Sequence, residues 1–319
     1  MTSRARAIDP RALLGIDLLV VGFFSLVFAA LALFSPRALS FWHASVVLPA
    51  ATLGVLVAAA AVRTMANERS LAALARRTGI LVADWLPLVI AVLVYENVHD
   101  LTYVFRPETV DARLWALDAR LFGVPPALAL DRLTTPWLTE LMSAAYALYF
   151  VYPALLLVLL YRRGDVARFR EVGLALGLCL YLGLVGYVLV PAIGPRYAMA
   201  GAFVHPLVGP WLTRSSARAW NLVQVIDRDC FPSLHTALTL LALVYFVRLR
   251  RVLPHGRLLV GLVAPPIALL WASTLYLRYH YGVDVIAGAV LALAVSAAAP
   301  RLLARYRELL LHRLTRRRG

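Results

Sequence analysis

The chain has 319 residues, of which 62% are hydrophobic and 15% are charged. A soluble domain carries about a quarter charged residues, so this composition excludes an ordinary soluble globular protein. The formal net charge of +15 comes from arginines that gather in alternate loops between apolar segments, a pattern typical of membrane topology and not of nucleic-acid binding.

Eight apolar segments are long enough to cross the ~30 Å hydrocarbon core of a bilayer as helices. They are approximately residues 13–34, 43–62, 79–96, 138–161, 171–190, 233–249, 258–277 and 283–299. Only helices and closed barrels satisfy their backbone in lipid, and these runs are too long for barrel strands. The sequence therefore predicts an all-α membrane bundle of about eight transmembrane helices. The first segment lacks a following small-residue cleavage signature, so we expect a retained helix.

The predicted organisation has three parts. Residues 1–78 hold two transmembrane helices and a basic connector, residues 79–300 form a six-helix core, and residues 301–319 form a basic tail. Arginines precede the first apolar segment and follow the second, fourth, sixth and eighth segments. The positive-inside rule then predicts a cell-membrane protein with both termini in the cytoplasm. Asp84 falls near a predicted cytoplasmic helix end, where we expect it to reach water.

The outer segment 97–137 contains the tetrapeptide Asp-Ala-Arg-Leu twice, at 111–114 and 118–121. Apolar side chains of this segment recur with helical spacing and predict one shared apolar face: Val110, Leu114, Leu117, Leu121 and Phe122. We expect one or two interfacial helices ending near Gly123, as a lid over a site or as a structural brace.

Two short segments place histidines at the mouths of long apolar helices. The first is Pro-Ser-Leu-His at 232–235, and the second runs from Arg278 through His280 to Asp284. Serine is a good N-cap, and proline suits a first helical turn. Both helices are predicted to begin at the outer face, so their N–H groups and positive dipole ends should point at one pocket that binds anions.

These residue types suit phosphoryl transfer without a metal, which needs a nucleophile, a proton donor for the leaving oxygen and cations around the phosphate. A neutral imidazole can attack phosphorus, and a carboxylate can hold its tautomer and stabilise the imidazolium. Asp284 is placed to do this for His280. A second histidine can protonate the leaving oxygen, and arginine binds phosphate oxygens with its fork of donors.

The two motifs resemble the type 2 phosphatidic acid phosphatase superfamily, whose members carry Pro-Ser-x-His and, downstream, His-x-x-x-Asp. The resemblance implies that His280 forms a phosphohistidine, that Asp284 orients it and that His235 is the general acid. The superfamily's Ser-Arg pair is Ser273-Thr274 here, and the arginine stands instead at Arg278, which resembles the inositolphosphotransferase-like branch.

The superfamily's Lys-x6-Arg-Pro motif is absent in that form. The corresponding outer loop, 190–197, supplies Arg196 as a candidate phosphate ligand beside Arg278 and Ser233. Other outer-loop arginines could bind a headgroup: Arg214, Arg218 and Arg228. We expect no cofactor and no metal, although Asp227 and Asp229 flank the first motif and could hold an ion. Cys179 and Cys230 fall in different regions and are not expected to pair.

The sequence thus predicts a membrane enzyme that transfers a lipid headgroup through a phosphohistidine at the outer face. Its expected partners are the bilayer and a lipid phosphate or phospholipid substrate, with no nucleic acid. Three alternatives stay open. One is a phosphatase for polyprenyl or lipid (di)phosphates, and another, from a different class, is a lipid transporter or flippase that uses the histidines as proton relays. The third is a catalytically inactive binding or scaffold protein, against which the intact His235, His280 and Asp284 argue. No pattern identifies the donor lipid, the acceptor or the oligomeric state.

Overall fold

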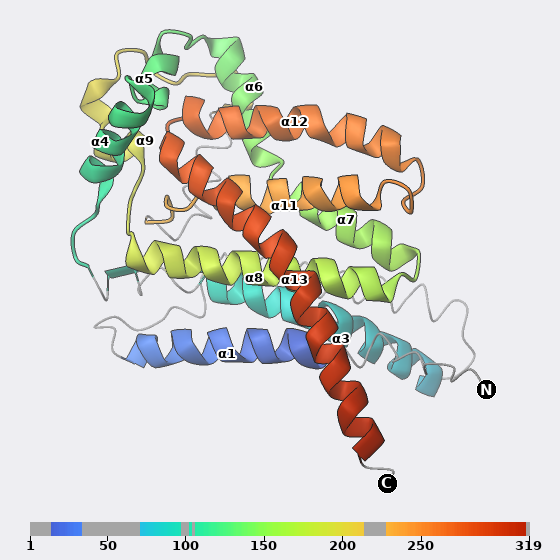
Figure 1. Ribbon diagram of the computed structural model, residues 1–319. Helices are drawn as coiled ribbons and strands as arrows, with labels where there is room; N and C mark the ends of the chain where they lie inside the picture. The colour runs from blue at the N-terminus through green and yellow to red at the C-terminus, as the bar shows by residue number, and fades with distance from the viewer. Residues whose placement is uncertain (1–13, 34–70, 97–101, 104–105, 214–227, 317–319) are drawn as a thin grey trace.

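The computed structural model describes residues 14–33, 71–96, 102–103, 106–213 and 228–316, and every regular element in them is a helix (Figure 1). The longer helices are α1 Leu14–Leu33, α3 Leu71–Glu96, α6 Pro136–Ala147, α7 Val151–Arg162, α8 Val166–Leu189, α11 Leu234–Leu249, α12 Gly256–Tyr276 and α13 Gly282–Arg316. The shorter helices are α4 Asp111–Phe122, α5 Pro126–Asp131, α9 Pro195–Ala198 and the 3-10 turn η3 Ala200–Ala202. The predicted all-α fold is confirmed.

Seven of the eight predicted apolar segments are helices in the structure, and the segment 43–62 lies outside the described residues. Within the described residues, four stretches are long and apolar enough to cross a membrane: Pro136–Arg162, Val166–Leu189, Gly256–Tyr276 and Gly282–His312. The apolar helix α11 is shorter than these. The multi-pass character is confirmed, and residues 301–316 of the predicted tail continue α13.

The predicted span 138–161 consists of two helices, α6 and α7, joined by a turn at residues 148–150. Pro153 has no N–H to donate to the carbonyl of Tyr149, so a continuous helix would lose a hydrogen bond at this point. The turn presents the ring of Tyr149 to the neighbouring helix α11, where it contacts His235.

Helix α8 lies at the centre of the bundle, and α1, α3, α7, α11 and α13 all pack against it. A helix that is apolar on all sides is expected to be buried, and most of α8 is buried. In Figure 1, α1, α3, α8, α11 and α12 run side by side, α13 crosses them obliquely, and α4, α5 and α9 gather at one end.

Helices α11 and α13 begin close together because Gly288 has no side chain. A Cβ atom at Gly288 would lie 2.3 Å from the carbonyl oxygen of Ser233. The backbone N–H of Ser233 donates to the carbonyl oxygen of Asp284 at 3.1 Å. This approach brings the two histidine motifs together at the end of the bundle where α4 lies.

Helix α4 ends before Gly123, whose φ of +78° suits glycine, as predicted. Of the predicted apolar face, Leu114 is buried, whereas Leu121 is 59% exposed and Leu117 is 42% exposed, so most of this face lies on the protein surface. The buried residues of α4 are instead Asp111, Leu114 and Asp118. The two aspartates turn inward because they accept backbone hydrogen bonds from the loops that carry the site.

Asp84 does not reach water, which contradicts the sequence-based expectation. Its side chain is 2% exposed and forms an ion pair with Arg170. The hydroxyl of Tyr161 donates to the same carboxylate at 3.1 Å. A buried charge is tolerated only when it is paired and hydrogen-bonded, and α7 and α8 supply these partners to Asp84 on α3.

Candidate active site

The two motif histidines contact each other. His280 lies in the loop between α12 and α13, and His235 lies in the first turn of α11. The Nε2 atom of His280 is 3.3 Å from the Nδ1 atom of His235. The residues are only 2% and 7% exposed, so both rings sit in a largely water-excluded pocket.

The hydrogen bonds of His280 assign the tautomers of both rings. Its Nδ1 atom lies 2.9 Å from the carbonyl oxygen of Cys230, which can only accept a hydrogen bond, so Nδ1 carries the proton. When His280 is neutral, its Nε2 has only a lone pair, and the contact between the rings then places a proton on Nδ1 of His235. The lone pair of one ring and the N–H of the other face each other.

Asp284 lies beside His280, but the two side chains are too far apart for a direct hydrogen bond. Its Oδ2 atom is 3.6 Å from Nδ1 of His280 and accepts hydrogen bonds of 2.8 Å from the N–H of Tyr281 and from the thiol of Cys230. The Cys230 carbonyl thus takes the orienting hydrogen bond expected of Asp284, while the carboxylate sits close enough to stabilise an imidazolium.

Cys230 is a site residue that sequence reasoning missed. Burial above all, and the neighbouring Asp284 charge, raise the pKa of the Cys230 thiol well above its ordinary value. The thiol therefore stays protonated and donates to Asp284, while its backbone carbonyl accepts from His280. The only available signal was the position of Cys230 two residues before the first motif, which does not predict either contact.

Cys230, His280 and Asp284 are also a possible ligand set for a metal ion, since their ligand atoms lie within 4.8 Å of one another. Tetrahedral zinc separates such sulfur, nitrogen and oxygen ligands by about 3.4–3.6 Å. The observed separations are 3.8, 3.6 and 2.8 Å, so an ion would have to break the contact between the thiol and the carboxylate. It would also occupy the groups that orient His280.

The ring of His235 contacts the rings of two tyrosines. Its centroid lies 4.3 Å from that of Tyr146, with the rings inclined by 25°, and 4.2 Å from that of Tyr149. Tyr279 stacks on the other side of Tyr146 at 4.8 Å, and the Arg196 guanidinium lies 4.8 Å from the Tyr279 centroid. Nothing in the sequence pattern singles out Tyr146 or Tyr149. The stack links Arg196 to the histidine pair.

Arg278 has a left-handed backbone conformation, with φ of +65°, and the residue is buried. One terminal nitrogen donates to Asp131 at 2.7 Å and to the carbonyl oxygen of His205 at 2.6 Å. The guanidinium also lies 4.2 Å from the centroid of Phe203. Its Nε is buried and finds no hydrogen-bond partner within the described parts of the chain.

Ser233 is the N-cap of α11 and is fully buried. Its hydroxyl oxygen accepts hydrogen bonds from the N–H of Thr236 at 3.3 Å and from the Thr236 hydroxyl at 3.2 Å. The capping role predicted for serine in this motif is present. These contacts fix the first turn of α11 and so the backbone that carries His235.

The N-terminus of α13 is not free, which contradicts the expectation of two open helix ends. The N–H groups of Gly282 and Val283 donate to the Asp118 carboxylate at 2.8 and 2.9 Å. Burial raises the pKa of Asp118 against the effect of these two donors. Asp111 holds the opposite loop through the N–H groups of Ile193 and Gly194. The segment is thus a brace for the site.

The other candidates divide between structural roles and undescribed positions. Arg228 donates to the carbonyl oxygens of Arg106 and Pro107, at 2.9 and 2.6 Å. Asp229 accepts a 3.4 Å hydrogen bond from the hydroxyl of Tyr95. Three candidates lie outside the described residues: Arg214, Arg218 and Asp227.

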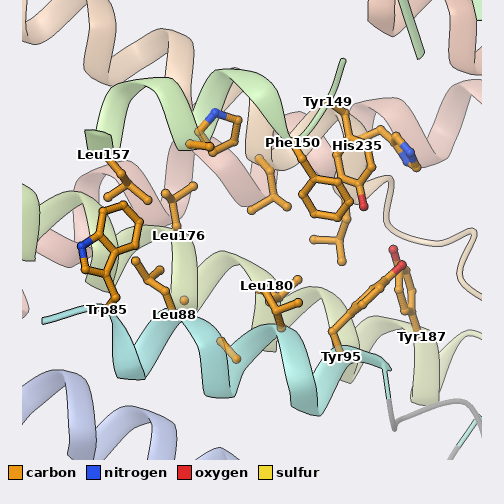
Figure 2. Close-up of a pocket in the computed structure, with 17 residues that line it drawn as sticks. Trp85, Leu88, Tyr95, Tyr149, Phe150, Leu157, Leu176, Leu180, Tyr187 and His235 are labelled. Carbon is orange, nitrogen blue, oxygen red and sulfur yellow. The ribbon is translucent and has the colours of Figure 1, made fainter. Parts of the chain in front are cut away.

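A cavity of about 220 Å³ opens beside His235, between α3, α7, α8 and α11. Figure 2 shows that its lining is mostly aliphatic and aromatic, with Trp85, Leu88 and Leu157 at the end away from His235. The site therefore combines a polar, hydrogen-bonded histidine pair with an apolar chamber inside the bundle.

A membrane-embedded helical bundle with this buried pair of histidines, a carboxylate beside them and nearby arginines defines a class of membrane enzymes that act on phosphate groups. The sequence matches the PAP2 superfamily over residues 112–298, which is more than half of the chain, and the protein belongs to that superfamily. This confirms the resemblance predicted from the two motifs.

One curated relative is the inositol phosphorylceramide synthase of Candida albicans, 25% identical over 227 residues. The match covers 66% of this chain and 46% of the relative, so the chain spans about half the length of the curated protein it matches. No solved structure matches the chain. Family and fold together place the chain among the helical membrane proteins of the PAP2 superfamily.

Proposed function

We propose that the protein is a metal-independent lipid phosphotransferase that moves a phosphorylated headgroup from a phospholipid to the hydroxyl of a second lipid. The observation that carries this proposal is the pairing of His280 Nε2 with His235 Nδ1 at 3.3 Å. The relative's printed name, a synthase of inositol phosphorylceramide, supports headgroup transfer over simple hydrolysis.

In the proposed first step, the lone pair on Nε2 of His280 attacks the phosphorus of the donor. With the donor bound, His235 is an imidazolium with protons on Nδ1 and Nε2. The bond between phosphorus and the oxygen of the lipid alcohol breaks, and His235 gives its Nδ1 proton to that oxygen and becomes neutral, with its remaining proton on Nε2. His280 becomes a positively charged phosphohistidine. The Cys230 carbonyl accepts its remaining N–H, and the Asp284 carboxylate, 3.6 Å from Nδ1, stabilises the charge.

In the second step, His235 now has a bare Nδ1 and accepts the proton of the acceptor hydroxyl. The acceptor oxygen attacks phosphorus and the bond between phosphorus and His280 breaks, so that His280 is again neutral and His235 is again an imidazolium. Water in place of the lipid hydroxyl would make the same intermediate end in hydrolysis. The acceptor alone thus separates a transferase from a phosphatase.

Arg196 and Arg278 are the proposed ligands of the phosphate oxygens, and Ser233 supports the helix turn beside them. Arg196 is half-buried and lies over Tyr279. Arg278 offers its Nε while Asp131 holds the guanidinium in place. Cations around the equatorial oxygens stabilise the charge that develops in the transition state.

We also propose that the site faces outward and that both termini are cytoplasmic. The support is the arginine pattern, because the arginine-rich loops alternate with the loops that carry the motifs. Single cysteines at Val204, which is 82% exposed, and at His312, which is exposed near the end of α13, test this orientation. A membrane-impermeant thiol reagent should label Val204→Cys from outside and His312→Cys only from inside. Labelling of both from one side contradicts the orientation.

The test of the function uses purified protein with radiolabelled phospholipids, lipid phosphates and lipid diphosphates, each with and without a lipid alcohol. We expect a new phospholipid in the presence of the alcohol and an acid-labile phosphoprotein. His280→Ala should lose both, while the exposed His312→Ala keeps both. Turnover by His280→Ala at the normal rate would overturn the mechanism, and free phosphate as the sole product would make the protein a phosphatase.

A further inference from the structure

We infer that the apolar cavity beside His235 holds one hydrocarbon chain of the donor lipid and limits the length of chain accepted. This inference rests on the proposed function, because it assigns the cavity to the substrate of the same site. The cavity lies between α3 and α7, which both pack on α8, and α11 closes it beside the histidine pair.

The lining selects an apolar occupant. Apart from His235 and three tyrosines, the side chains that face the cavity are aliphatic residues, Trp85 and Phe150. A volume of about 220 Å³ far exceeds the roughly 10–15 Å³ that admits one water, yet large apolar cavities stay dry and bind apolar molecules. Atoms lining an empty cavity lose dispersion contacts that a hydrocarbon chain would restore.

The cavity is polar at one end only, and this polarity gives the direction of the chain. Figure 2 shows the hydroxyls of Tyr95, Tyr149 and Tyr187 gathered at the end where His235 lies. The opposite end is formed by Trp85 and neighbouring leucines. A lipid whose phosphate sits at the histidine pair would place its ester region near the tyrosines and its chain toward Trp85.

Trp85 closes one end of the cavity, and its side chain is held by packing contacts. The indole packs edge-on against Tyr161, with centroids 5.7 Å apart, and lies 5.1 Å from the ring of Phe169. The preceding residue, Asp84, forms the buried ion pair with Arg170. These contacts from α7 and α8 hold the indole in place, so Trp85 sets the depth available to a chain.

Gly177 offers a test that fills the cavity without a backbone clash. It lines the cavity from α8, and a Cβ atom built on it meets nothing within 4 Å. Gly261 in α12 is a matched control, since a Cβ there also meets nothing within 4 Å and the residue is exposed away from the cavity. Both positions are helical, so Gly→Leu changes helix propensity equally.

The experiment measures kcat/KM for donors with one headgroup and chains of increasing length. Gly177→Leu should lower kcat/KM for long-chain donors by about tenfold, the cost of losing burial for roughly two methylenes, and should leave a short-chain donor unchanged. Gly261→Leu should match the wild type at every length. Trp85→Ala should shift the preferred length upward.

A second readout needs no variant. A donor carrying a photoactivated diazirine at the end of its chain should label peptides of α3 or α8 around Trp85 and Gly177. Labelling confined to other helices, or equal length profiles for Gly177→Leu and Gly261→Leu, overturns the inference while the phosphoenzyme persists. Absence of the phosphoenzyme in the wild type overturns the proposed function itself.

Discussion

The Nε2 atom of His280 lies 3.3 Å from the Nδ1 atom of His235, although 45 residues separate the two histidines in the chain. The carbonyl oxygen of Cys230 makes this contact directional, because it requires the proton of His280 to be on Nδ1. In the proposed mechanism, the Nε2 lone pair of His280 attacks phosphorus, and the Nδ1 proton of His235 goes to the leaving oxygen.

His235→Ala should slow turnover by about 10²–10⁴-fold, the usual contribution of a general acid, because the leaving oxygen would depart without a proton. A donor with a nitrophenyl leaving group needs no such proton, so its turnover should be largely restored. The measurement compares kcat for the two donors in each variant. His280→Ala should be inactive with both, and equal loss with both donors in His235→Ala would exclude the acid role.

Cys230→Ala should lower kcat by about tenfold, since the Asp284 carboxylate loses a hydrogen bond worth roughly 1.5–3 kcal/mol to a charged group. Cys230→Ser should keep most of the activity, because a hydroxyl can replace the thiol as donor and the backbone carbonyl remains. Cys179→Ala removes the other buried cysteine, in α8, and serves as the control. Full activity in Cys230→Ala would show that the thiol contact is dispensable.

Asp118→Ala should destabilise the fold, since the N–H groups of Gly282 and Val283 would lose their acceptor. Loss of a helix cap costs about 0.5–2 kcal/mol. Thermal unfolding in detergent should show a lower transition for Asp118→Ala and an intermediate one for Asp118→Asn, whose amide oxygen can still accept. An unchanged transition in the alanine variant would contradict the bracing role of α4.

Asp131 should make stability depend on acidic pH. Burial opposes ionisation, but hydrogen bonds from His205 and Val204 and the charge of Arg278 together hold the pKa of Asp131 below its ordinary value. A depressed folded-state pKa gives stability that is present above the unfolded-state value of about 3.9 and lost as pH falls through the folded-state value.

The variant Asp131→Asn tests this sign. The free energy of unfolding of the wild type should exceed that of the variant above about pH 4, and the difference should shrink at lower pH. Chemical unfolding followed by tryptophan fluorescence at several pH values measures the difference. If the difference in unfolding free energy between wild type and variant grew as the pH fell, the predicted sign would be wrong.

Activity should survive a saturating chelator, because the proposed chemistry uses a histidine lone pair, a histidine proton and arginine charges. The assay compares turnover before and after incubation with chelator, and then with added magnesium. Loss of activity that magnesium restores would contradict metal independence. It would direct attention to Asp229, whose carboxylate accepts from Tyr95.

The helical segments and the two motifs could be read from the sequence because their signals are local. Apolar runs long enough for a bilayer predict helices without reference to distant residues. Ser233 predicts the start of α11 because its side chain caps the helix. Gly123 predicts the end of α4 because glycine readily adopts a positive φ. The order and spacing of His235, His280 and Asp284 were sufficient to predict the superfamily, which the comparison confirms.

The tertiary structure decided the partners, because each contact joins segments far apart in the chain. Asp118 caps a helix that begins 164 residues later, and the apolar pattern of α4 does not predict this buried contact. Cys230, Tyr146 and Tyr149 enter the site only when α6 packs against α12 and when α11 packs against α7, α12 and α13. The cavity likewise could not be predicted from the sequence, because residues of four different helices line it and its volume depends on how those helices pack.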